Sequence, residues 1–103
     1  VVFGCGGDRD KAKRAQMGRI AEARAQRVWI SDDNPRTENP GNIVSDILLG
    51  MSGSSWVMHD RCEAIRAAIT TAGRHDWVLI AGKGHETQQV YADRVIELND
   101  YKI

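Results

Sequence analysis

The chain has 103 residues, 42% of them hydrophobic, which suffices for one domain around one core. Its 14 Lys+Arg balance 14 Asp+Glu, which excludes attraction to nucleic acid or an anionic membrane through a net charge. No apolar run approaches the roughly 18 residues of a spanning helix, no signal peptide is visible, and Cys5 and Cys62 do not make a disulfide framework. We expect a cytoplasmic protein with neither nucleic acid nor membrane as partner.

Four short apolar runs are rich in β-branched or aromatic residues, as strands are. They span residues 1–4, 28–31, 56–58 and 77–81. This composition predicts four strands buried on both faces of a sheet.

Three stretches between these runs have the period of amphipathic helices. The first, 11–25, places Met17, Ile20, Ala21 and Ala25 on one side. Asn39-Pro40 predicts a cap and first-turn proline for the second, whose apolar stripe is Ile43, Val44, Ile47, Leu48 and Met51. Residues 60–63 have capping-box spacing, and the third helix buries Ile65, Ala68, Ile69 and Ala72 until Gly73 ends it.

This alternation predicts an α/β fold with right-handed crossovers and a mostly parallel sheet covered by helices on both faces. Polar loops follow three of the strands, at residues 6–11, 32–38 and 82–86. Ligands of such sheets bind beyond the carboxyl ends of the strands. We therefore expect the three loops to converge on one crevice.

The most informative loop contains Asp33, Asn34, Pro35 and Arg36. Arg36 can bind a carboxylate bidentately, while Asp33 and Asn34 can bind an ammonium group. Pro35 restricts the backbone between them. The loop could therefore hold a zwitterion, and the alternative is a turn that only ends a strand.

The glycine-containing loops match no nucleotide motif. Arg9 stands where a dinucleotide fingerprint needs its third glycine, and the stretch 82–84 lacks the spacing of a Walker loop. The first loop can still bring backbone amides and the charges of Arg9, Lys11, Lys13 and Arg14 to an anion, or be a solvated helix turn.

No catalytic or metal-binding pattern stands out among the histidines and cysteines. His59, His75 and His85 lie in unrelated segments, without the spacing of metal ligands. Cys5 has no base placed beside it and fits a small buried residue better than a nucleophile. We expect no metal site and no catalytic residue in this chain.

Several motifs, taken in order, closely resemble the C-terminal domain of Mur ligases, in particular those that add meso-diaminopimelate to UDP-N-acetylmuramoyl-L-alanyl-D-glutamate. The motifs are Val-Phe-Gly-Cys-Gly-Gly-Asp-Arg-Asp-Lys at 2–11, Met-Gly at 17–18, Asp-Asp-Asn-Pro-Arg-Thr-Glu at 32–38, Asp-Ile-Leu at 46–48, Asp-Arg-x-x-Ala-Ile at 60–65 and Val-Leu-Ile-Ala-Gly-Lys-Gly-His-Glu at 78–86. The resemblance covers residues 1 to about 86.

The resemblance implies a Rossmann-like domain that brings the amino acid to an ATP-dependent ligase of peptidoglycan synthesis. In that family ATP phosphorylates an acyl group, the incoming amine attacks the acyl phosphate, and phosphate leaves. The UDP-sugar, ATP and Mg are bound mainly by two other domains, including a central ATPase domain. The resemblance assigns the meso-diaminopimelate pocket to Arg9, Asp33, Asn34, Pro35, Arg36, Gly82 and Glu86, with Arg36 on the distal carboxylate.

The chain departs from the family pattern at its start, after Glu86 and, in the first helix, at Ala12 and Ala15-Gln16. The family's domain begins with a further strand and helix, so residues 1–103 are expected to be an N-terminally incomplete C-terminal domain that is inactive alone. After Glu86 the family's loop is longer than the stretch that here leads into residues 91–94. The alternative function is a free-standing module that binds an amino acid or nucleotide without catalysis and dimerises or leaves a sheet edge exposed.

Overall fold

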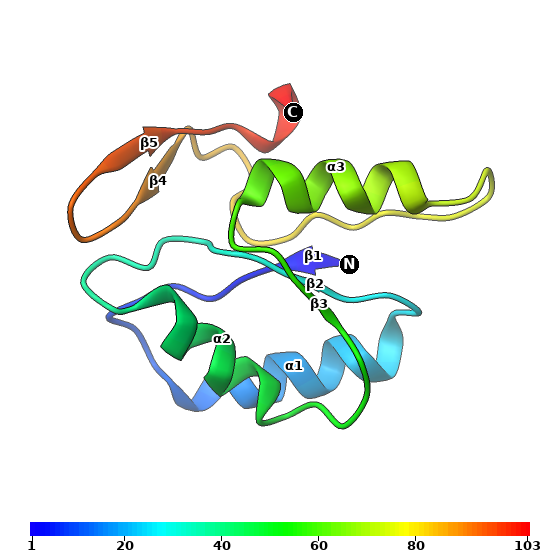
Figure 1. The fold of residues 1–103 in the computed structure, drawn as a ribbon, viewed down its shortest axis with the longest axis horizontal. Helices are drawn as coiled ribbons and strands as arrows, with labels where there is room; N and C mark the ends of the chain where they lie inside the picture. Colours follow the sequence, from blue (N-terminus) through cyan, green and yellow to red (C-terminus); the bar gives the residue numbers. More distant parts are fainter.

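The computed structural model describes all residues, 1–103, and contains a three-stranded parallel sheet between two layers of helices. The elements follow the order β1 (Val2–Phe3), α1 (Ala12–Arg24), β2 (Trp29–Ile30), α2 (Pro40–Leu48), β3 (Trp56–Val57), α3 (Arg61–Thr71), β4 (Gln88–Val90), β5 (Val95–Glu97) and the 3-10 helix η1 (Asp100–Lys102). The sheet order is β1-β2-β3. Helices α1 and α2 cover one face and α3 the other (Figure 1). This confirms the predicted α/β, Rossmann-like architecture. No helix is both long and apolar enough to span a membrane.

Two apolar clusters, one on each face of the sheet, form the core. Consecutive strand residues point to opposite faces, so Phe3 and Ile30 face α1 and α2 while Val2 and Trp29 face α3. The first cluster consists of Phe3, Cys5, Val28, Ile30, Ile43, Val44 and Ile47, and the second of Val2, Trp29, Ala64, Ile65 and Ala68. The helices therefore bury apolar surface on both sides of very short strands.

The predicted starts of α2 and α3 are confirmed by their caps. Asn39 accepts a hydrogen bond from the amide of Gly41 at 2.8 Å, with Pro40 in the first turn. Asp60 accepts one from the amide of Glu63 at 3.1 Å. Each side chain satisfies an amide that has no partner within its helix.

The fourth predicted strand is only partly present. The segment 77–81 runs beside β1 through the bonds Val2 N to Leu79 O and Ala81 N to Val2 O, and forms one parallel bridge. Trp77 is 97% exposed and Leu79 63% exposed. The expectation of a strand buried on both faces is wrong here, because Val78 and Ile80 pack against the cluster beside α3 whereas the alternate side chains, Trp77 and Leu79, are left uncovered.

Burial was also predicted wrongly in β3 and α1. Trp56 stacks against Trp29 in β2 but is 47% exposed, because β3 is an edge strand. In α1, Met17 and Ile20 are exposed, whereas Arg14 and Gly18 are buried. The side of α1 that carries Arg14 and Gly18 faces α2. At Gly18 a side chain would collide with the carbonyl of Ile47 in α2.

The antiparallel hairpin β4–β5 was not predicted. Its strands are joined by the turn at 91–94, and Gln89 is paired with Ile96. The hairpin is anchored by its neighbours rather than by a core of its own. Gln89 donates to the backbone carbonyl of Asp32 at 3.0 Å, and the amide of Arg36 donates to the carbonyl of Val90.

Candidate functional site

The three polar loops predicted to converge do meet at one edge of the sheet. The amide of Gly7 in the first loop donates to the carbonyl of Asn34 in the second at 2.8 Å. Lys83 in the third loop donates through Nζ to Oδ1 of the same Asn34 at 2.8 Å. Asn34 is therefore the point at which all three loops are joined.

The first two loops are also connected through Asp8. This residue has a φ of 57° and accepts hydrogen bonds from the hydroxyl of Thr37 at 2.7 Å and the amide of Thr37 at 3.2 Å. Its own amide donates to Glu38. At Gly7 a side chain would overlap the carbonyl of Pro35, so this close approach of two backbones requires glycine.

Arg14 connects these loops through its hydrogen bonds and is not a free positive charge. Its guanidinium is buried and donates to both carboxylate oxygens of Glu38 at 2.9 Å, to Asp46 at 3.0 Å and to the carbonyl of Gly6. The pairing with Arg14 lowers the pKa of Glu38 to about 2. The expected contribution of Arg14 to anion binding is therefore wrong, because its charge is already neutralised.

A basic pair lies at the first loop. Arg36 has a φ of 53° and donates through Nη1 to the carbonyl of Gly7 at 2.9 Å. A side chain added at Gly6 would lie 2.9 Å from Nη1 of Arg36 and 3.5 Å from Cγ of Arg9, so both arginines approach this glycine. Neither arginine has a carboxylate partner. These two positive charges remain available to an anionic group.

An acidic pair lies at the third loop, with Lys83 between its members. Oδ1 of Asp33 lies 3.4 Å from Nζ of Lys83, and Oε2 of Glu86 lies 3.9 Å from it. Oδ2 of Asp33 would lie 2.9 Å from a side chain at Gly82, which has a φ of 111°. Glycine at this position lets the third loop pass close to Asp33.

Sequence reasoning missed Lys83, which we considered only as a Walker lysine. Its side chain is fully buried and bonds Asn34 and the carbonyl of Gln88. A lysine between two glycines after a strand is a weak signal, because nothing in the sequence shows which carboxylates and carbonyls will surround it.

A separate polar cluster involves His59, at the carboxyl end of β3. Its Nδ1 lies 2.7 Å from Oδ1 of Asp32, and the hydroxyl of Tyr91 donates to Oδ2 of Asp32 at 2.8 Å. Burial, followed by this bond to Asp32, raises the pKa of the Tyr91 phenol. The cluster lines a cavity of about 870 Å³ that contains none of the seven predicted site residues, and no three His, Cys, Asp or Glu side chains gather as metal ligands would.

Comparisons with known proteins identify the family of this chain. Residues 1–84 match the family model described as Mur ligase, glutamate ligase domain. UDP-N-acetylmuramoyl-L-alanyl-D-glutamate–2,6-diaminopimelate ligases from Alkalilimnicola ehrlichii and Coxiella burnetii are each 52% identical over 101 residues, which cover 97% and 96% of this chain but 20% and 21% of theirs.

A solved structure of a ligase of the same name is also similar. It superposes with a TM-score of 0.92 at 42% identity, over 98% of this chain and 21% of the other. The chain thus spans about a fifth of the length of the curated relatives it matches. From the match over 1–84 and the identity of about half its residues to these ligases, the chain belongs to the Mur ligase family.

Proposed function

We propose that this chain is the amino-acid-binding C-terminal domain of an ATP-dependent ligase that adds meso-diaminopimelate to UDP-N-acetylmuramoyl-L-alanyl-D-glutamate in peptidoglycan synthesis. The single observation that carries the substrate assignment is the separation of charge at the edge of the sheet. Arg9 and Arg36 approach Gly6 without carboxylate partners, while Asp33 and Glu86 flank Gly82 and Lys83. The names of the relatives support the same substrate.

The chemistry of diaminopimelate matches this arrangement. The molecule carries one ammonium and one carboxylate group at each of its two ends. A site that binds it therefore needs groups of both charges, spaced apart. In our proposal Arg36 binds the distal carboxylate, Asp33 and Asn34 bind an ammonium group, and Arg9, Gly82 and Glu86 complete the pocket. Lysine lacks the distal carboxylate and would leave Arg36 unpaired.

We propose that ATP and Mg are bound mainly by parts of the protein outside this chain. No cluster of three potential metal ligands exists here, and the stretch 82–84 is not a phosphate loop. The chain's own contribution is to bind and orient the incoming amine, so we expect residues 1–103 alone to have no ligase activity. A central ATPase domain of the same protein and the UDP-N-acetylmuramoyl-dipeptide are its proposed partners, and the cytoplasm its proposed compartment.

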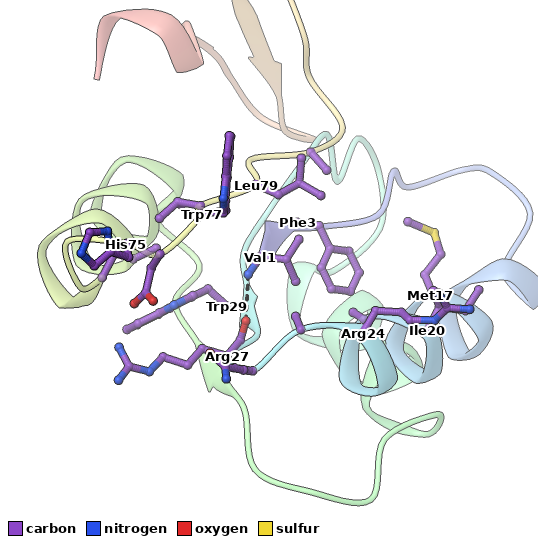
Figure 2. A pocket seen from close by; sticks show the side chains of 18 residues that line it. Val1, Phe3, Met17, Ile20, Arg24, Arg27, Trp29, His75, Trp77 and Leu79 are labelled. Atoms are coloured by element: carbon purple, nitrogen blue, oxygen red, sulfur yellow. Dashed lines mark hydrogen bonds between the residues drawn. The ribbon is translucent and has the colours of Figure 1, made fainter.

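We also propose that 1–103 is an N-terminally incomplete domain and that a preceding strand and helix cover its apolar groove. This groove has a volume of about 720 Å³, and 13 of its 18 lining residues are hydrophobic. Figure 2 shows Trp77 and Leu79 on one side of it, Met17 and Ile20 on the other, and Val1 and Phe3 between them. The segment 77–81 also has one edge free for a further strand. Relatives five times as long have ample chain for this role.

The test is an assay of the full-length protein that contains this chain. Phosphate release should require ATP, the UDP-N-acetylmuramoyl-dipeptide and meso-diaminopimelate together, and lysine should be a poor replacement. Formation of the tripeptide product is confirmed by mass spectrometry. Equal turnover with lysine would contradict the substrate assignment, and no amino-acid-dependent turnover would contradict the ligase function.

A further inference from the structure

Lys83 is almost completely buried at the loop edge, which is unusual for a lysine. Lysine is almost never fully buried unless it is paired. Here Nζ donates to Oδ1 of Asn34 at 2.8 Å and to the carbonyl of Gln88 at 2.9 Å, and Oδ1 of Asp33 lies 3.4 Å away as its ion-pair partner. Two of the three donors of the ammonium group are thus bonded within the chain, and its charge is paired with Asp33.

The bonds that begin at Lys83 continue to the backbone of Arg36. Oδ1 of Asn34 also accepts from the amide of Val90 at 2.9 Å, and the carbonyl of Val90 accepts from the amide of Arg36 at 3.0 Å. Arg36 has a φ of 53°, a conformation that non-glycine residues rarely adopt. Such a backbone persists only where its surroundings fix it.

From this connected set we propose that Lys83 is a positioning residue for the amino-acid substrate. It fixes Asp33 directly and Arg36 through Asn34 and Val90, and thereby sets the spacing between an acidic and a basic group of the site. The inference rests on the proposed function and deepens it, because Lys83 itself is enclosed and does not touch the substrate.

The experiment uses the full-length enzyme with Lys83→Met, Lys83→Arg and, as a matched control, Lys102→Met. Lys102 is an exposed lysine in η1 with no role in the site. Lys83→Met should raise the Michaelis constant for diaminopimelate roughly tenfold or more, and that for ATP should barely change. Lys83→Arg keeps the charge but not the shape, so it should restore part of the loss. Lys102→Met should behave as the wild type.

A second measurement reads the linkage without catalysis. Amide hydrogen exchange should become faster in the peptide containing Val90 for Lys83→Met, and should be unchanged for Lys102→Met, because the bond from Val90 to Asn34 loses its support. If Lys83→Met does not fold, Lys83→Gln, which keeps donors of hydrogen bonds, takes its place in both measurements.

The outcomes separate this inference from the proposed function. An unchanged diaminopimelate constant in Lys83→Met, or equal increases for diaminopimelate and ATP, would overturn the positioning role. Unchanged exchange at Val90 would overturn the linkage itself. A wild-type enzyme without diaminopimelate-dependent turnover would instead contradict the proposed function, and the exchange measurement would still decide whether Lys83 supports Val90.

Discussion

The polar loop edge buries charged side chains, whereas the apolar groove exposes hydrophobic ones. At the loop edge two cations, Arg14 and Lys83, are almost completely buried. In the groove Trp77 and Leu79 are exposed. Charged groups are buried where the chain supplies their partners, and apolar groups are exposed where residues 1–103 supply none. The loop edge is therefore organised by contacts within this chain, whereas the groove is the surface that, in our proposal, another segment covers.

We expect the largest effect at Arg36, a charge at the loop edge without an acidic partner. Arg36→Ala in the full-length enzyme removes one partner of the proposed ion pair with the distal carboxylate, a loss of roughly 2–5 kcal/mol. The Michaelis constant for diaminopimelate should rise at least about tenfold, and that for ATP should barely move. Steady-state kinetics with each substrate varied measures both constants.

Two controls sharpen this prediction. Arg36→Lys should rescue binding only in part, because an ammonium group cannot form the bidentate pair. Lysine as substrate should lose little through Arg36→Ala and should become relatively better. An equal loss for ATP and diaminopimelate would mean that Arg36 is a structural residue of the turn.

A substitution in the groove tests whether another segment covers it. In the full-length protein Trp77→Ala should lower stability by about 2–4 kcal/mol, because a covered tryptophan loses its packing. Tyr101→Ala is the matched control, since Tyr101 is 82% exposed and lies outside the groove, and its effect should be near zero. Thermal unfolding midpoints compare the two. Equal midpoints would show that the groove stays open.

Removing Arg14 tests whether the loop edge depends on its buried cation. Arg14→Met should destabilise the protein by about 2–3 kcal/mol, somewhat below the loss for a fully buried pair, because Asp46 is 38% exposed. The carboxylate of Glu38 would keep only the amide of Asp8 as a donor, and the carbonyl of Gly6 would lose the guanidinium. Chemical unfolding of wild type and variant measures the difference. A variant of wild-type stability would contradict a supporting role for this cation.

The smallest expected effect is a change in pH dependence from Glu38. Its pKa in the folded protein is lowered to about 2 from an ordinary 4.5, chiefly by hydrogen bonds from Arg14. A lowered pKa stabilises the fold above the ordinary value, and this contribution is lost as the pH falls toward 2. Glu38→Gln should therefore make the unfolding midpoint depend less on pH below about 5.

An exposed glutamate provides the control for this measurement. Glu97→Gln in β5 should follow the wild-type curve of midpoint against pH, since Glu97 is exposed and has no ion-pair partner. If Glu38→Gln followed the same curve as wild type, the pair with Arg14 would not contribute to stability.

From β1 to α3, the order of the elements and the layers of the fold could be predicted from the sequence alone. Helix caps such as Asn39 and Asp60 act within a few residues, so their signals are local and were interpreted correctly. The convergence of three loops also followed from local patterns, because parallel strands bring their carboxyl ends to one edge. The motifs shared with the family lie in the same three loops. The binding roles of the residues in these loops stay predictions.

Which charges are available and which apolar residues are covered became visible only in the folded chain. Arg14 and Arg36 look equally free in the sequence, yet Arg14 is neutralised by Glu38 and Asp46, which lie 24 and 32 residues away. Lys83 meets Asn34 across 49 residues. Trp77 is exposed because no described segment lies over it. Burial and pairing depend on contacts between distant segments, and one sequence carries no record of such contacts before the chain is folded.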